Sequence, residues 1–147
     1  LAYLHSNTSK PNCVHYDVSD RNYLTDGRGA VLIDFGTSYE EGNFPKGYRE
    51  SKIGTDEFMS PEKLRCEPEH GRESDIFGLG VVAYKVLVGL PPFWSSFGNL
   101  RDQILYRDPA LPIISGNGQI DRVIMACLEK DWRNRPSAEE VMKDFKL

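Results

Sequence analysis

The sequence predicts a mainly α-helical fold, in which about five or six helices surround a buried central helix and a small β-hairpin lies beside them. Three observations support this fold class. Apolar residues occur on every side of segment 76–88, as in a helix that is buried all round. Apolar residues also recur at helical spacing in several later segments. Two short strand patterns flank one strong turn within residues 23–33.

The length and composition fit one domain, or one lobe of a larger domain. The chain has 147 residues, of which 39% are apolar, so it can form a buried core. Its net charge of −4 offers no cationic field for nucleic acid or an anionic membrane. The longest apolar run, 76–90, is too short and too interrupted to span a bilayer. The three cysteines are widely spaced, which favours a reducing compartment over disulfides.

The first third of the chain contains the hairpin. Residues 1–5 have the pattern of the end of a helix. Residues 23–25 and 30–33 are short strand candidates, and the Asp-Gly-Arg-Gly sequence between them predicts a tight turn. Residues 34–52 are polar and show no periodicity, so we expect a long loop there.

The central helix follows a shorter one. Ser60, as a capping residue, and Pro61, in the first turn, predict a short helix. Ser74 or Asp75 is expected to cap the next helix, which runs to about Val88 and stops at glycine. This is the helix that we expect at the centre of the fold.

Three further helices are expected after it. Apolar residues at 100, 104 and 105 predict the first, and those at 120, 123, 124 and 127 predict the second. Ser137 and Glu140 have the spacing of a capping box for a last helix through Phe145.

Polar residues that are able to carry chemistry cluster before and after the hairpin. Asp17 and Asn22 are five residues apart on an irregular segment, so a carboxylate and an amide can converge there. Asp34 follows the second strand, and Gly36 frees the backbone next to it, which suits a Mg²⁺ site. Each residue alone also fits a simple turn or cap.

Together these residues resemble the catalytic and metal-binding segments of eukaryotic-type protein kinases, in the pattern H-x-D-x-x-x-x-N followed by D-F-G. Three later segments resemble that family in the same order. They are residues 54–62 (GTDEFMSPE), 74–81 (SDIFGLGV) and 131–137 (DWRNRPS). The resemblance covers almost the whole chain and implies the C-terminal, catalytic lobe of the kinase fold as one domain over residues 1–147.

The resemblance implies a role for each residue of the first cluster. Asp17 is the catalytic base that orients the substrate hydroxyl, and Asn22 and Asp34 hold Mg²⁺ on the phosphates of ATP. His15 has a structural role, packing near Phe35.

It also implies contacts between distant segments. Glu62 pairs with Arg135, which holds the end of the activation loop against the last helices. Asp75 accepts hydrogen bonds from the backbone near residue 16, and Thr55 hydrogen-bonds toward Asp17 in the substrate groove. The Thr55 feature is typical of Ser/Thr kinases.

Residues 15–22, which match the H-x-D-x-x-x-x-N pattern, are called the catalytic segment below. Two residues of this segment depart from the family pattern. Tyr16 stands where the family has the Arg that pairs with a phosphate on the activation loop. Ser19 replaces the Lys that neutralises the transferring phosphate in Ser/Thr kinases. Arg21 stands where tyrosine kinases often have an Arg, and is a candidate for the replacement cation. We therefore include Ser19 and Arg21 in the catalytic group.

The Gly-rich loop, strand Lys and helix Glu of the family's N-terminal lobe do not occur in this sequence. The resemblance therefore implies transfer of the γ-phosphoryl group of ATP to a protein Ser or Thr hydroxyl, with Tyr as the alternative acceptor, only together with an N-terminal lobe. The implied partners are that lobe and a protein substrate, with no nucleic acid and no direct membrane contact. We expect a cytoplasmic protein, or the inner part of a membrane receptor.

Two other functions are compatible with these residues. A pseudokinase would use the same lobe as an interaction surface without catalysis. A small-molecule kinase of the aminoglycoside or choline type shares a similar His-x-Asp to Asn spacing, but lacks the segment at 54–62 and the helix that begins near Asp75.

Overall fold

The computed structural model describes residues 1–6, 12–43, 45–47, 54–67, 71–94, 98–109 and 116–145. In these ranges the chain forms five α-helices and two separate two-stranded antiparallel sheets. The mainly helical fold class predicted from the sequence is confirmed. None of the helices is long and apolar enough to cross a bilayer, considering the described residues alone.

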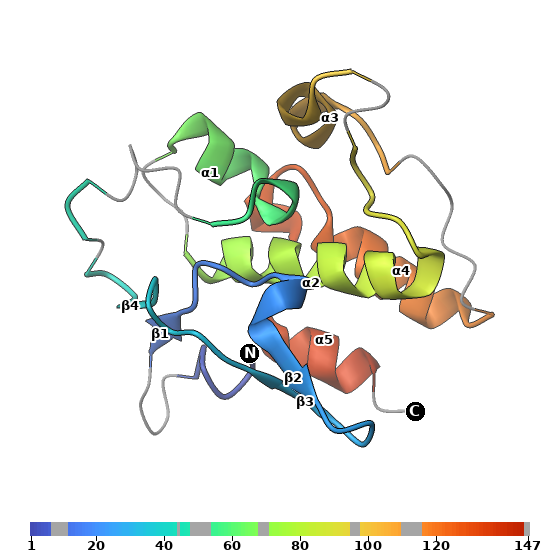
Figure 1. The fold of residues 1–147 in the computed structure, drawn as a ribbon, viewed down its shortest axis with the longest axis horizontal. Helices are drawn as coiled ribbons and strands as arrows, with labels where there is room; N and C mark the ends of the chain where they lie inside the picture. Colours follow the sequence, from blue (N-terminus) through green and yellow to red (C-terminus); the bar gives the residue numbers. More distant parts are fainter. Residues whose placement is uncertain are drawn as a thin grey trace.

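The long helix α2 (Arg72–Val88) lies at the centre of the molecule (Figure 1). α4 (Gly118–Cys127) packs against it, and α5 (Ala138–Asp144) packs against α4. On the other side, α1 (Pro61–Arg65) contacts α3 (Leu100–Tyr106). The predicted buried central helix is therefore present.

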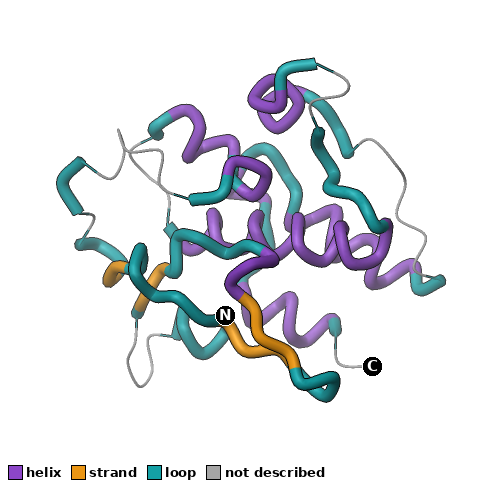
Figure 2. The backbone as a smooth tube through the Cα atoms, viewed as in Figure 1, coloured by secondary structure: helices purple, strands orange, loops and turns teal. Residues whose placement is uncertain are grey.

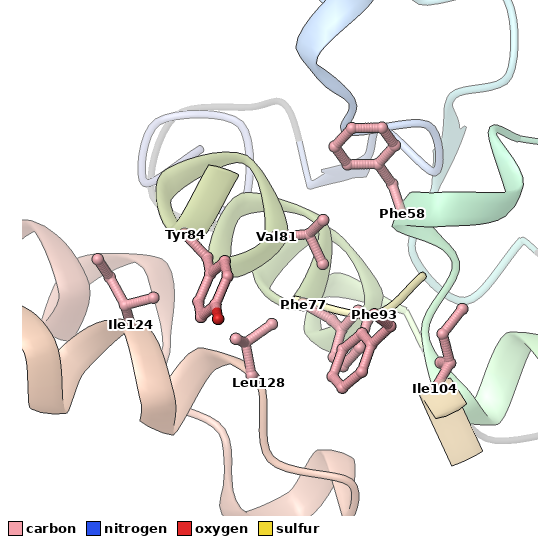
Figure 3. Close-up of a cluster of buried hydrophobic side chains, with 8 residues drawn as sticks. All are labelled: Phe58, Phe77, Val81, Tyr84, Phe93, Ile104, Ile124 and Leu128. Atoms are coloured by element: carbon pink, nitrogen blue, oxygen red, sulfur yellow. The ribbon is translucent and has the colours of Figure 1, made fainter. Parts of the chain in front are cut away.

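Aromatic and aliphatic side chains from α2 fill the main core with residues from its neighbours (Figure 3). The rings of Phe77 and Phe93 stack with centroids 6.2 Å apart. Tyr84 is fully buried despite its hydroxyl group. The buried members of this cluster are Phe58, Phe77, Val81, Tyr84, Phe93, Ile104, Ile124 and Leu128. Burial on several faces explains why α2 shows no single apolar stripe in its sequence.

The start of α2 differs from the prediction. Gly71 is the residue before the first helical turn, and both Ser74 and Asp75 lie inside the helix rather than capping it. Their side chains are buried and bond to other segments, so tertiary contacts take the place of the capping role. The predicted end is confirmed, because Gly89 adopts φ +83° and its N–H bonds to the Lys85 carbonyl.

The other helix ends also combine expected and unexpected caps. The predicted capping box of Ser137 and Glu140 is present at α5. Ser60 precedes α1 as expected but makes no capping hydrogen bond, and its hydroxyl instead donates to the Ser74 hydroxyl at 3.1 Å. Side chains of Asn99 and Asn117 cap α3 and α4.

The predicted hairpin forms β2 (Tyr23–Thr25) and β3 (Ala30–Leu32), in which Tyr23 pairs with Leu32 (Figure 2). A second pair, β1 (Cys13–Val14) and β4 (Tyr39–Glu40), was not expected. β4 interrupts the long loop predicted for residues 34–52, of which positions 44 and 48–52 lie outside the described residues. The predicted helix end at residues 1–5 is a single turn, closed by a 2.8 Å bond from the His5 N–H to the Leu1 carbonyl.

Candidate active site

Asp17 and Asn22 converge because a 3-10 helix, Asp20–Asn22, bends the chain back between them. The Asn22 amide nitrogen donates to the Asp17 carbonyl oxygen at 2.8 Å and to carboxylate Oδ2 at 3.0 Å. Asn22 is buried, whereas Asp17 is partly exposed. A carboxylate held in this way keeps one orientation while remaining open to a reactant.

Thr55 holds the other carboxylate oxygen. Its backbone N–H donates to Asp17 Oδ1 at 3.2 Å, so the two oxygens are held by different segments of the chain. The sequence predicted a contact from Thr55 toward Asp17, and the structure makes it through the backbone rather than through the hydroxyl.

Asp34 follows β3 in an exposed position next to this group. The Ile33 N–H donates to the Asn22 carbonyl at 2.8 Å, which brings the end of the hairpin beside the catalytic segment. Asp34 has φ +61°, and its Oδ1 accepts from the Gly36 N–H at 3.2 Å. A non-glycine residue in this left-handed region is strained, and such strain concentrates at functional sites.

His15 joins the catalytic segment to the hairpin end. Its ring meets the ring of Phe35 edge to face, with centroids 4.9 Å apart. Nε2 lies 3.0 Å from the Ile33 carbonyl oxygen, and Nδ1 accepts from the Asp17 N–H at 3.3 Å. The buried imidazole thus fixes the backbone on both sides of the site, as expected for a structural residue.

Asp75 links the central helix α2 to the catalytic segment through hydrogen bonds. Its carboxylate accepts from the backbone N–H groups of His15 and Tyr16, both at 2.8 Å. His5 Nε2 lies 2.9 Å from the same carboxylate, in a buried position. The backbone contacts match the expectation for Asp75. His5 was missed, since a lone histidine at the end of a turn gives no sequence signal.

Glu62 and Arg135 form a buried ion pair across the molecule. Arg135 donates to the two Glu62 oxygens at 2.7 and 2.8 Å, and to the backbone carbonyls of Glu129 and Glu73 at 2.8 Å each. The Ser74 hydroxyl donates to Glu62 at 2.9 Å. Burial would raise the pKa of Glu62, but hydrogen bonding and charge from Arg135 outweigh it and lower that pKa.

The structure does not support the catalytic role given to Ser19. Its side chain is fully buried, and its hydroxyl has no hydrogen-bond partner among the described residues. This burial argues against contact between the Ser19 side chain and a substrate, and the catalytic role of Ser19 stays a prediction. Arg21 is exposed on the short 3-10 helix, where it remains a candidate cation.

Oxygen ligands suited to Mg²⁺ are present in the group. The Asn22 nitrogen is engaged by Asp17, which leaves the amide oxygen for a cation, and the Asp34 carboxylate is exposed. The described residues contain no cluster of three or more His, Cys, Asp and Glu arranged around a metal. A magnesium ion here would be held by the Asn22 amide oxygen and the Asp34 carboxylate, together with oxygens of a bound phosphate.

Lys63 is a further charged residue at this site that the sequence analysis missed. Its Nζ donates to the Tyr16 carbonyl at 2.5 Å and lies 3.6 Å from the centroid of the Tyr16 ring. The one sequence signal for Lys63 is its position directly after Pro61-Glu62. That signal is weak, because an isolated lysine in a short helix is usually solvated.

The sequence of this chain matches a known protein family. Residues 1–145 match the family model described as the protein kinase domain, so the chain belongs to the protein kinase family. The match favours the protein-kinase interpretation over a small-molecule kinase.

Individual relatives support the same family. The chain is 33% identical to mitogen-activated protein kinase kinase 2 of Arabidopsis thaliana over 153 residues, covering 97% of this chain and 41% of the relative. It is 36% identical to the serine/threonine-protein kinase Sgk2 of Homo sapiens, covering 92% and 35%. It is 35% identical to the serine/threonine-protein kinase Sgk1-B of Xenopus laevis, covering 99% of this chain and 32% of the relative. The chain thus spans about a third of the length of most of these relatives.

Proposed function

We propose that this chain is the catalytic lobe of a Ser/Thr protein kinase, which transfers the γ-phosphoryl group of ATP to a hydroxyl of a protein substrate. The arrangement of Asp17 carries the proposal. Its two carboxylate oxygens accept from Asn22 and Thr55, and its position is partly open to solvent. The Sgk relatives are named serine/threonine-protein kinases, which favours Ser or Thr over Tyr as the acceptor.

In this proposal the chain acts by positioning and by charge. Asp17 accepts a hydrogen bond from the substrate hydroxyl, orients its oxygen and receives its proton. Asn22 and Asp34 would hold Mg²⁺ through their side-chain oxygens. Bound ATP and Mg²⁺ supply the phosphoryl group and the charge that neutralises it.

The nucleotide-binding half of the site is proposed to come from an N-terminal lobe outside residues 1–147. Exposed apolar side chains on and next to the hairpin support this proposal. Leu24 is 61% exposed, Val31 65% and Phe35 51%. Covering apolar surface of this kind is favourable in water. We expect the isolated lobe to be inactive.

We further propose a cytoplasmic location, with the inner part of a receptor as the alternative. Cys13, Cys66 and Cys127 are all free thiols, which is the state expected in a reducing compartment.

The test is phosphotransfer to a mixed Ser/Thr peptide library by the full-length protein and its Asp17→Asn variant. We expect the variant to lose activity by roughly 10²–10⁴-fold, as for removal of a general base, while nucleotide affinity stays the same. Asp20→Asn is the control, because Asp20 is a nearby carboxylate that pairs with Lys85 on the surface.

Two results would overturn the proposal. If Asp17→Asn transfers phosphate as fast as the wild type, Asp17 is not the base. If the wild type binds nucleotide but transfers no phosphate, the pseudokinase interpretation holds, as the departures at Tyr16 and Ser19 would then indicate. Transfer to amino alcohols instead of peptides would identify a small-molecule kinase.

A further inference from the structure

The peptide group that joins Tyr16 to Asp17 is held in an unusual way. Tyr16 has φ +69°, a left-handed conformation that is strained for a residue with a bulky side chain. Asp75 accepts from the Tyr16 N–H at 2.8 Å, and the His15 ring accepts from the Asp17 N–H. The carbonyl oxygen of this peptide group requires its own partner if the plane is to stay fixed.

Lys63 is that partner. Its Nζ donates to the Tyr16 carbonyl at 2.5 Å. The same ammonium group lies 3.6 Å from the centroid of the Tyr16 ring, which adds a cation–π contact. Lys63 belongs to α1, forty-six residues further along the chain than Asp17. One side chain thus links the segment after the long loop to the peptide that begins Asp17.

Lys63 also brings positive charge to the Asp17 carboxylate. Gly54 lies between them: a Cβ atom there would be 3.0 Å from Lys63 Nζ and 3.4 Å from Asp17 Oδ1. The ammonium and the carboxylate oxygen therefore flank one point, and Tyr16, Asp17, Gly54, Thr55 and Lys63 line the same small pocket.

The surroundings of Lys63 are desolvated and acidic. Burial lowers the pKa of Lys63 to about 8, while the charges of Asp75, Asp17 and Glu62 oppose that shift. These carboxylates come from α2, the catalytic segment and α1 itself, and the ring of the Tyr16 phenol also lies against the ammonium group. Lys63 is still mainly protonated at neutral pH, so it acts as a cation there.

We propose that Lys63 is a positioning residue for Asp17, and that it supplies from α1 the cation that the catalytic segment lacks at Ser19. It fixes the Tyr16 carbonyl and thereby the direction of the Asp17 side chain. The inference rests on the proposed function, because it assigns a role within the same phosphotransfer site.

The test compares Lys63→Met with Lys130→Met in the full-length protein. Lys130 is a matched control: its Nζ donates to the Ile104 carbonyl at 2.8 Å, lies 3.8 Å from the Phe93 ring centroid and has a pKa lowered by burial to about 8. Lys63→Met removes the cation but keeps the chain length. We expect its kcat to fall by roughly 10–100-fold with the KM for ATP unchanged, since small misplacements near the reacting atoms cost rates of that order. Lys130→Met should keep the wild-type kcat.

A pH profile separates positioning from stability. Lys63→Arg should restore most of the kcat and extend activity above pH 8, because guanidinium does not titrate there. If Lys63→Met does not fold, Lys63→Arg alone decides: a wild-type alkaline limb in this variant contradicts the inference.

The outcomes distinguish the two proposals. If the wild type and Asp17→Asn are equally inactive, the phosphotransfer function fails and the role of Lys63 fails with it. If the wild type is active, Asp17→Asn is inactive and Lys63→Met keeps the wild-type kcat, only the role of Lys63 is refuted. Equal loss in Lys63→Met and Lys130→Met also refutes it, because the effect would then be general destabilisation.

Discussion

Charged side chains inside this protein are compensated residue by residue. Arg135 satisfies Glu62 with two hydrogen bonds and donates two more to backbone carbonyls. Its guanidinium also lies 4.9 Å from the ring centroid of Phe77. Because both side chains are almost wholly buried, solvent screens the pair very little.

At this scale we predict the result of removing one member of that pair. Arg135→Met leaves the Glu62 carboxylate buried without its cation, so the free energy of unfolding should fall by about 3–5 kcal/mol. Urea denaturation of the purified protein measures this loss. Arg133→Met is the matched control two residues away, where the side chain is exposed and pairs with exposed Asp131. If the two variants are equally stable, the buried pair does not hold the α1 segment to the last helices.

At the scale of elements, α2 organises the site from within. Asp75, in the first turns of α2, accepts hydrogen bonds from backbone N–H groups of the catalytic segment. Gly78, one turn later, lies against the backbone of the same segment. A Cβ on Gly78 would be 2.5 Å from the Val18 carbonyl oxygen, a distance at which atoms overlap. The helix approaches the catalytic segment so closely only because this position has no side chain.

We therefore predict that Gly78→Ala displaces the catalytic segment. Alanine favours the helix by about 1 kcal/mol over glycine, but overpacking against a backbone carbonyl costs roughly 1–3 kcal/mol. The net effect on the free energy of unfolding should be a loss, accompanied by lower phosphotransfer. Val86→Ala in the same helix is the control, because Val86 is 76% exposed. A Gly78→Ala protein that is as active and as stable as the wild type would contradict the close contact.

At the scale of the whole molecule, burial shifts the pKa values of several groups, and these shifts make the stability depend on pH. The pKa values of Lys63 and Lys130 are lowered from 10.5 to about 8, mainly by desolvation. Burial raises the pKa of the Cys127 thiol from 9.0 to about 12. Lysines and cysteine thus affect stability in opposite directions as the pH rises.

The expected pH dependence follows from proton counting. Above about pH 8 the folded state releases protons from the two lysines while the unfolded state still binds them. Stability therefore rises with pH between about 8 and 9. Above pH 9 the unfolded state loses the Cys127 proton first, which opposes the rise. Urea denaturation at half-unit steps from pH 7.5 to 9 measures the trend, and Lys130→Met should reduce its slope. A stability that falls over this interval would contradict the lysine shifts.

The sequence alone determined the features that depend on neighbouring residues. The capping box at Ser137, the end of α2 at Gly89 and the β2–β3 hairpin all arise from local backbone preferences, which short stretches of sequence encode. The order of motifs also indicated the family, because each motif carries a chemical group at fixed spacing.

Only the tertiary structure decided the contacts between distant segments. In the structure Ser74 and Asp75 lie inside α2 rather than at its cap, and Ser19 is buried. Lys63 donates to the Tyr16 carbonyl. From local sequence alone, such residues are as well suited to a solvated surface as to a buried position. Their burial and partners depend on how α1, α2 and the catalytic segment pack, because the free energy of a buried polar group depends on partners far away in the chain.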